Sequence, residues 1–170
     1  PSRENDEGEG ATPLDKGFTT FDNTLASTGG ITSILGGCDA SGAFNDIWYS
    51  YIAPEDGFLE ISTCPGGVAG LDTDLFLYSG SCGNLTQLAC DGDACGPNSG
   101  FGSFIDKTSV FAGETYFLRL GGFNGNRGSG NLLLNYSVSG DDCFAATTAS
   151  LGPNTFDTSN LSNSASPVPL

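Results

Sequence analysis

The chain has 170 residues, a formal net charge of −15 and only five basic residues. Nucleic acids and anionic membranes are therefore not expected as partners, because both require a positive surface. No histidine is present, which excludes Ser-His-Asp and Cys-His catalytic arrangements. No position distinguishes a catalytic pair of carboxylates from the aspartates of ordinary turns. We expect a protein without enzymatic activity.

The length suits one domain, and 12 phenylalanines can build its core. Many short β-favouring segments are bounded by Gly, Asp, Asn and Ser, and few stretches resemble helix. This pattern predicts an all-β protein, a jelly-roll-like antiparallel β-sandwich of about eight strands with an extended C-terminal tail. No apolar stretch approaches the roughly 18–20 residues of a membrane span. The chain begins at Pro1 without a signal peptide, and we interpret it as a processed or partial chain.

In chain order, residues 1–10 are polar and acidic and are predicted to form a flexible segment. The first strand is expected at residues 18–23. The strongest strand signal covers residues 46–53, where Ile47, Tyr49 and Tyr51 alternate with Trp48, Ser50 and Ile52. A turn at residues 54–57 leads to a strand at 58–64, so residues 46–64 are predicted to form a hairpin. Further strands are expected at residues 74–79, 85–90, 104–111, 115–120 and 131–138.

An internal repeat marks the end of the predicted domain at residue 140. The tripeptide Thr20-Phe21-Asp22 returns as Thr155-Phe156-Asp157, an offset of 155 − 20 = 135. Five further positions are identical at this offset, namely Asp6/Asp141, Ala11/Ala146, Thr12/Thr147, Gly17/Gly152 and Ser27/Ser162. We therefore divide the chain into an acidic segment (1–10), a sandwich domain (11–140) and a tail (141–170) that resembles the start of a second copy.

Several motifs, in their order and spacing, resemble the bacterial pre-peptidase C-terminal (PPC) domain and its repeated relatives on surface proteins. The segments that carry the resemblance are residues 45–51, 53–57, 61–64, 72–78, 88–91 and 112–119. The Asp-Asp-Cys sequence at residues 141–143 also resembles the start of such a repeat. The resemblance covers roughly residues 6–138. It implies a jelly-roll-like sandwich, secretion and no catalytic activity, and some relatives bind calcium or an extracellular polymer. The first copy has Gly8 where the second has Cys143, so a disulfide expected at this opening cannot form inside the first copy.

Six cysteines are present: Cys38, Cys64, Cys82, Cys90, Cys95 and Cys143. An even number of cysteines, together with the N-glycosylation sequons at Asn84, Asn135 and Asn160, favours an extracellular or cell-surface location. We expect Cys82 to pair with Cys90, because they flank a short connection, and Cys38 to pair with Cys64. Cys95 and Cys143 then pair within the chain, or Cys143 reaches Cys95 of a neighbouring copy. The sequence alone does not decide among the possible pairings.

Two pairs of aspartates are candidate calcium ligands: Asp72 with Asp74, and Asp91 with Asp93. The alternative is that these aspartates form turns and strand entries. Calcium is the one cofactor that the sequence suggests.

The aromatic residues Trp48, Tyr49 and Tyr51 could form a sugar-binding platform. The alternation instead favours Trp48 as a core residue, on the face opposite Tyr49 and Tyr51. Arg119 lies among apolar residues in a predicted strand and is expected to pair with a carboxylate across the sheet.

Two functions stay open. The first is a structural or adhesive module, possibly a filament subunit, whose segment 145–169 docks on a neighbouring copy. The second is a module that targets a secreted hydrolase to a polysaccharide or protein. The expected partner is a second copy of the chain or another extracellular protein or polymer.

Overall fold

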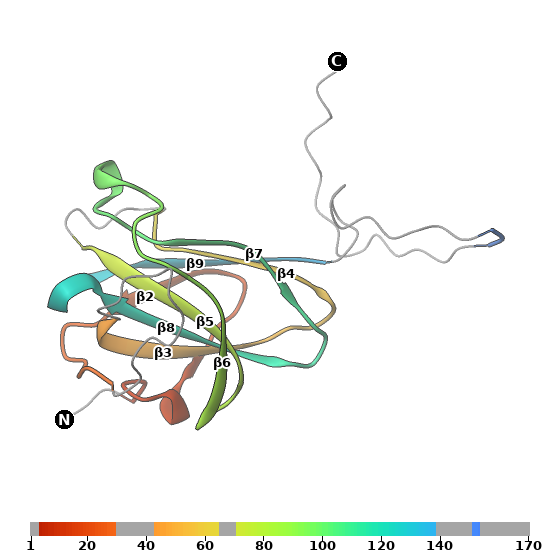
Figure 1. Cartoon of the computed structure of the whole chain (residues 1–170), viewed down its shortest axis with the longest axis horizontal. Helices are drawn as coiled ribbons and strands as arrows, with labels where there is room; N and C mark the ends of the chain where they lie inside the picture. Colours follow the sequence, from red (N-terminus) through yellow and green to blue (C-terminus); the bar gives the residue numbers. More distant parts are fainter. Residues whose placement is uncertain (1–3, 30–42, 65–70, 139–150, 154–170) are drawn as a thin grey trace, which may run out of the picture.

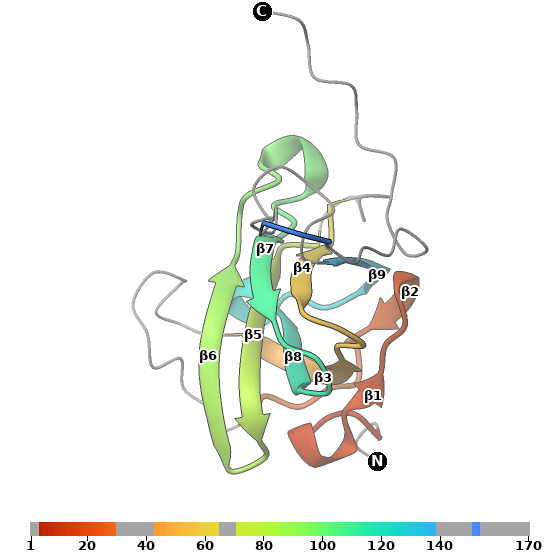
Figure 2. The ribbon, with the colours of Figure 1, turned by 90° about the vertical axis from the view of Figure 1, so that its right-hand side faces the viewer.

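The structure is a computed structural model that describes residues 4–29, 43–64, 71–138 and 151–153. Within these residues nine strands form two sheets. Figure 1 colours the strands from the N-terminus to the C-terminus, and Figure 2 shows the two sheets as two layers. The predicted all-β sandwich is confirmed. The helical elements of the described residues are single 3₁₀ turns, and none is long and apolar enough to cross a bilayer.

The first sheet has five strands in the order β1-β3-β8-β5-β6. Their bounds are Thr12–Pro13, Phe44–Ile52, Thr115–Gly122, Thr73–Ser81 and Asn84–Asp91. The second sheet has four strands in the order β2-β9-β4-β7. Their bounds are Gly17–Asp22, Ser129–Val138, Gly57–Ser62 and Phe104–Val110. Strand β1 runs parallel to β3, and every other pair is antiparallel. The 3₁₀ turns are η1 (Gly8–Gly10), η2 (Pro97–Ser99) and η3 (Phe123–Gly125).

All eight strands predicted from the sequence are present within a few residues of their expected bounds. The ninth, β1, was not predicted. It consists of Thr12 and Pro13, and two residues are too few to show an alternation of apolar and polar side chains. Proline is tolerated there because β1 is an edge strand, where a missing N–H costs no hydrogen bond within the sheet.

The predicted hairpin over residues 46–64 is wrong. Strand β3 pairs with β1 and β8 in one sheet, whereas β4 pairs with β7 and β9 in the other. The connection between them crosses from one layer to the other. Ala53, which starts this connection, exchanges backbone hydrogen bonds with Gly113 and Glu114 of the β7–β8 turn and not with β4. Among the described strands, β5 and β6 are the consecutive pair that forms a hairpin.

The main hydrophobic core fills the space between the sheets. Leu59 and Ile61 of β4 face Ile47 and Tyr49 of β3 in this core, and all four are at most 3% exposed. Alternation in each strand directs these side chains inward. Tyr49 therefore lies in the main core, while Trp48 points to the opposite face of its sheet. The sequence favoured the Trp48 face of this strand as the core, so the main core lies on the face opposite to the predicted one.

The N-terminal segment closes one side of the sandwich by adding an edge strand to each sheet. Strand β1 ends the first sheet and β2 ends the second. Between them Leu14 enters the main core, and its N–H donates to the carbonyl of Ser50. Phe21 of β2 is 3% exposed in the same core. This segment is thus an integral part of both layers.

Candidate functional site

A second hydrophobic cluster lies on the outer face of the first sheet. It contains Ala43, Trp48, Phe76 and Tyr78. Arg119 of β8 is opposite Trp48 on one side and opposite Phe76 on the other, and its guanidinium lies 5.8 Å and 6.0 Å from the centres of these two rings. The predicted burial of Trp48 is confirmed, since it is 2% exposed.

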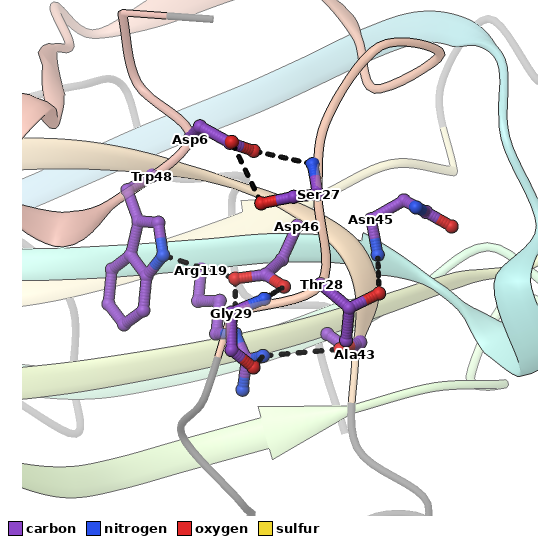
Figure 3. A network of polar contacts seen from close by, with 9 residues as sticks. All are labelled: Asp6, Ser27, Thr28, Gly29, Ala43, Asn45, Asp46, Trp48 and Arg119. Atoms are coloured by element: carbon purple, nitrogen blue, oxygen red, sulfur yellow. Dashed lines mark hydrogen bonds and ion pairs between the residues drawn. The ribbon is translucent and has the colours of Figure 1, made fainter. Parts of the chain in front are cut away.

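Asp46 is the partner of Arg119 in this cluster. Its Oδ2 accepts hydrogen bonds from Arg119 Nε (2.8 Å) and Trp48 Nε1 (3.1 Å), and its Oδ1 accepts one from Gly29 N (2.9 Å), as Figure 3 shows. Burial on its own lowers the pKa of Arg119, but the hydrogen bond and charge of Asp46 outweigh this and raise it. The prediction that Arg119 pairs with a carboxylate across the sheet is confirmed.

A β-bulge places Asp46 on this face. The β3–β8 register shifts between Phe44 and Ile47, and Asn45 adopts the left-handed conformation with φ 50°. Asparagine tolerates this conformation better than most residues. Its side chain donates to Ala26 O (3.0 Å) and its backbone N–H donates to Thr28 Oγ1 (3.2 Å). The bulge is thereby fixed to the loop that follows β2.

The N-terminal segment covers Trp48. The backbone N–H of Trp48 donates to the carbonyl of Asn5, and the side-chain amide of Asn5 donates to the carbonyl of Trp48. Asp6 accepts hydrogen bonds from both the backbone N–H and the hydroxyl of Ser27 (2.6 and 2.8 Å; Figure 3). Asn5 and Asp6 belong to the segment 1–10 predicted to be flexible, yet both are buried. The hydrogen bonds of Asn5 and Asp6 therefore tie the segment to the sandwich.

The two pairs of candidate calcium ligands lie at one end of the sandwich. The β5–β6 pairing sets Leu75 opposite Asp91, so that Asp74 lies beside Gly92. Asp91 Oδ2 accepts hydrogen bonds from the backbone N–H groups of Ala94 (3.0 Å) and Phe104 (2.8 Å). Asp91 thus stabilises a turn, which was the alternative to calcium binding. Asp72 and Asp93 line a cavity of about 220 Å³ together with two phenylalanines, Phe101 and Phe123.

In the part of the chain that the structure describes, no group of three or more Asp, Glu, Cys or His residues could hold a metal ion. Calcium binding stays a prediction.

A buried hydroxyl cluster supports this end of the molecule. Thr63 Oγ1 and Thr73 Oγ1 are 2.7 Å apart, and both accept from the backbone N–H of Ser103. The Ser103 hydroxyl donates to the carbonyl of Thr73. All three residues are at most 3% exposed. The hydroxyls satisfy one another and the backbone, so they hold the β4, β5 and β7 ends together.

The disulfide of this end joins Cys64, after β4, to Cys95 in the β6–β7 connection, with a Cα–Cα distance of 5.7 Å. The predicted pair Cys38–Cys64 is therefore wrong. Its premise was the hairpin, whereas β4 lies in the other sheet, beside the β6–β7 connection. The predicted contact of Cys143 with Cys95 is wrong as well, because Cys95 is already bonded. Cys38 and Cys143 lie outside the described residues.

The predicted pair Cys82–Cys90 is also wrong. Cys90 is disulfide-bonded, and Cys82 is the free thiol among the described cysteines. Cys82 lies in the turn of the β5–β6 hairpin, whereas Cys90 lies near the other end of β6. The six residue-to-residue steps of strand from Asn84 to Cys90 span about 20 Å, far beyond the Cα separation of about 7 Å that a disulfide allows.

The sequons differ in what the structure shows of them. Asn84, at the start of β6, and Asn135, in β9, are both exposed. Asn160 lies outside the described residues. Glycosylation stays a prediction for all three.

A tyrosine-lined cavity lies where β3 and β9 end. The cavity measures about 330 Å³ and is lined by Lys16, Tyr51, Pro54, Glu55, Tyr136 and Val138. The rings of Tyr51 and Tyr136 are 6.2 Å apart at an angle of 45°, and the Tyr136 hydroxyl donates to the carbonyl of Glu55 (3.0 Å). Burial, the Tyr136 hydroxyl and Asp15 raise the pKa of Tyr51 to about 12. The alternative of a sugar-binding platform of Trp48, Tyr49 and Tyr51 is not realised, since the first two are buried. Tyr136 is the partner that sequence analysis missed.

No family model matches the sequence, and no curated protein matches it. Among solved structures, the chain is similar to the pre-peptidase C-terminal domain of a collagenase from Bacillus anthracis. The two are 12% identical with a TM-score of 0.48, and the match covers 79% of this chain and 97% of that domain. The β-sandwich assignment rests on the two sheets described above.

Proposed function

We propose that this chain is a non-catalytic structural module of an extracellular assembly, and that its C-terminal segment joins it to another copy of the same sandwich. The observation that carries this proposal is the nature of the repeated residues. Five of the eight positions within residues 6–27 that recur at the offset of 135 lie in the edge strands β1 and β2, with which the N-terminal segment completes the two sheets. The chain thus carries a second edge segment in addition to the one that its own sandwich uses.

Four of the repeated positions have clear structural roles in the first copy. Phe21 is buried in the main core, and Phe156 repeats it. Thr12 forms β1, and Thr147 repeats it. The hydrogen-bonded pair of Asp6 and Ser27 is repeated as Asp141 and Ser162. A second segment with these residues suits the same place on a sandwich.

The backbone supports the repeat at one described position of the tail. Gly17, where β2 begins, has φ +119°, and Gly152 has φ +113°. Residues with a side chain rarely adopt this conformation. Gly152 of the tail is thus equivalent to Gly17 in both residue type and backbone conformation. In the first copy, this glycine is the residue at which the edge strand β2 begins.

Insertion of residues 141–162 into a second copy would exchange them for that copy's own residues 6–27. Such an exchange adds strands to sheet edges and repeats head to tail, so it does not close on itself. The product is a filament or an adhesive array. An extracellular location agrees with the Cys64–Cys95 disulfide, because such bonds persist in oxidising compartments.

A labelled synthetic peptide of residues 141–162 tests the proposal. Fluorescence anisotropy should show saturable binding of this peptide to the full-length protein under reducing conditions. A peptide with Phe156→Asp should not bind, because the residue that replaces Phe21 in the core would carry a charge. Equal binding of the two peptides, or no saturable binding of either, would contradict the proposal.

The tyrosine-lined cavity favours a second function, a targeting module that binds a polymer. Its volume of about 330 Å³ and its mixture of aromatic rings with a few polar groups are typical of ligand sites. Retention of the protein on polysaccharide, collagen or cell-wall matrices should then be lost in Tyr51→Ala. It should be unchanged in Phe18→Ala, which removes an exposed aromatic residue outside the cavity. A protein that no matrix retains would argue against this function.

A further inference from the structure

We propose that Cys82 is the attachment point for Cys143 of a second copy, and that an intermolecular disulfide between them locks the exchanged segment in place. This inference rests on the assembly proposed above and names its covalent contact.

Cys82 lies directly against the N-terminal segment. A Cβ atom built on Gly8 would be 3.4 Å from Cys82 Sγ and 3.7 Å from the ring of Trp48, with no closer contact. These are ordinary van der Waals distances, so position 8 has room for a side chain. A sulfur attached to that carbon is within bonding reach of Cys82.

The repeat places a cysteine at this position. At the offset of 135, Cys143 corresponds to Gly8 and Phe144 corresponds to Glu9. Where residues 141–162 occupy the place of residues 6–27, Cys143 is set against Cys82 of the receiving molecule. The receiving molecule's own segment has glycine there and forms no such bond. The disulfide therefore distinguishes the incoming segment from the resident one.

The other described cysteines do not compete for this role. Cys64 and Cys95 are bonded to each other, and Cys90 is disulfide-bonded. Cys82 is a half-exposed free thiol in the β5–β6 turn. Its surroundings also change on exchange, because burial and the charge of Glu9 raise the pKa of the Cys82 thiol. Replacement of Glu9 by Phe144 removes that negative charge.

The reaction joins Cys82 Sγ to Cys143 Sγ. Two S–H bonds break, and two protons and two electrons are released. Molecular oxygen accepts them, or a small-molecule disulfide is reduced to two thiols by exchange. No other bond of the protein changes.

Disulfide mapping of an isotopically mixed sample tests the inference. Equal amounts of ¹⁴N- and ¹⁵N-labelled full-length protein are oxidised with a small-molecule disulfide, digested and analysed by mass spectrometry. The expected product is a Cys82–Cys143 peptide pair with one light and one heavy partner, absent from Cys82→Ser and from Cys143→Ser. Peptide pairs in which both partners always carry the same label, or linkage of Cys143 to another cysteine, would overturn the inference.

Gly8→Cys provides the matched control. The new thiol should bond to Cys82 within one chain and abolish the mixed-label product, whereas Thr20→Cys, on the exposed face of β2, should leave that product unchanged. A Gly8→Cys protein that leaves Cys82 free would refute the geometry. If the 141–162 peptide binds under reducing conditions but no Cys82–Cys143 pair forms on oxidation, the disulfide is wrong and the proposed assembly stands.

Discussion

Asp46 and Arg119 form a charge pair whose side chains are 0% and 1% exposed. The guanidinium also donates to the carbonyls of Ala43 (3.2 Å) and Gly29 (3.5 Å), so one cation holds β3, β8 and the loop after β2. A buried ion pair adds little stability relative to apolar residues of the same size, but the loss of one partner is costly. The network thus determines which segments must meet on the outer face of the first sheet.

We expect Asp46→Asn to destabilise the protein by about 3–5 kcal/mol, because it leaves the Arg119 charge buried without a counter-charge. Unfolding in urea, followed by tryptophan fluorescence, measures this loss. The matched control is Asp106→Asn on the exposed face of β7, which should change the unfolding free energy by no more than about 0.5 kcal/mol. Equal effects of the two substitutions would contradict the role assigned to Asp46.

The raised pKa of Tyr51 leads us to expect that the free energy of unfolding falls in alkali. This pKa is raised from 10.0 to about 12 by burial, by Tyr136 and by Asp15. Above the lower value the unfolded chain releases the tyrosine proton while the folded protein keeps it, so the free energy of unfolding falls as the pH rises between these values. Below them Tyr51 has no effect of this kind. In Tyr51→Phe the decline between pH 10 and 12 should be shallower than in the wild type, as urea unfolding at several pH values would show. Identical slopes would contradict this interpretation.

At the scale of the elements, alternation of apolar and polar residues located the strands but not their neighbours. Ile47, Tyr49, Leu59 and Ile61 are buried in one core, as their period of two predicts. A hairpin and a crossing between two sheets give the same alternation, because in both cases the strands bury one face. The β3–β4 crossing is instead determined by long-range contacts, such as those of Ala53 with the β7–β8 turn.

Cysteine pairing could not be predicted for the same reason. Cys64 and Cys95 are 31 residues apart and meet because β4 and the β6–β7 connection are at the same end of the second sheet. The Arg119–Asp46 pair was predictable in kind, since a charge in an apolar strand requires a counter-charge. The contribution of the loop after β2 to this network was not predictable, because no sequence pattern around Asn45 or Gly29 indicates that they contact each other's segments.

We expect the double variant Cys64→Ser/Cys95→Ser to lose about 2–4 kcal/mol of stability, because the unfolded chain regains the entropy of a closed loop. The effect should appear as a lower urea midpoint than that of the oxidised wild type. Cys82→Ser is the control, since it removes a thiol that closes no loop in the single chain, and its midpoint should match the wild type. A double variant as stable as this control would show that the bond contributes nothing to the fold.

At the scale of the whole molecule, the sandwich and the repeat lead to one view of the protein. The N-terminal segment supplies the edge strands β1 and β2 of the two sheets, and the chain contains a second segment that repeats Thr12 of β1 and Phe21 of β2. Each copy also carries a formal charge of −15. Like charges repel, and salt screens that repulsion over about 8–10 Å at physiological ionic strength. Association should therefore be stronger in moderate salt than at low ionic strength.

The measurement that tests the central claim most directly is the solution mass of the reduced full-length protein at increasing concentration, by sedimentation velocity in moderate salt. We predict that the wild type forms larger species as its concentration rises. Phe156→Asp should stay monomeric, and Val168→Asp, which lies outside the repeated residues, should behave as the wild type. A wild-type protein that stays monomeric at every concentration, or an assembly that Phe156→Asp leaves intact, would contradict the account.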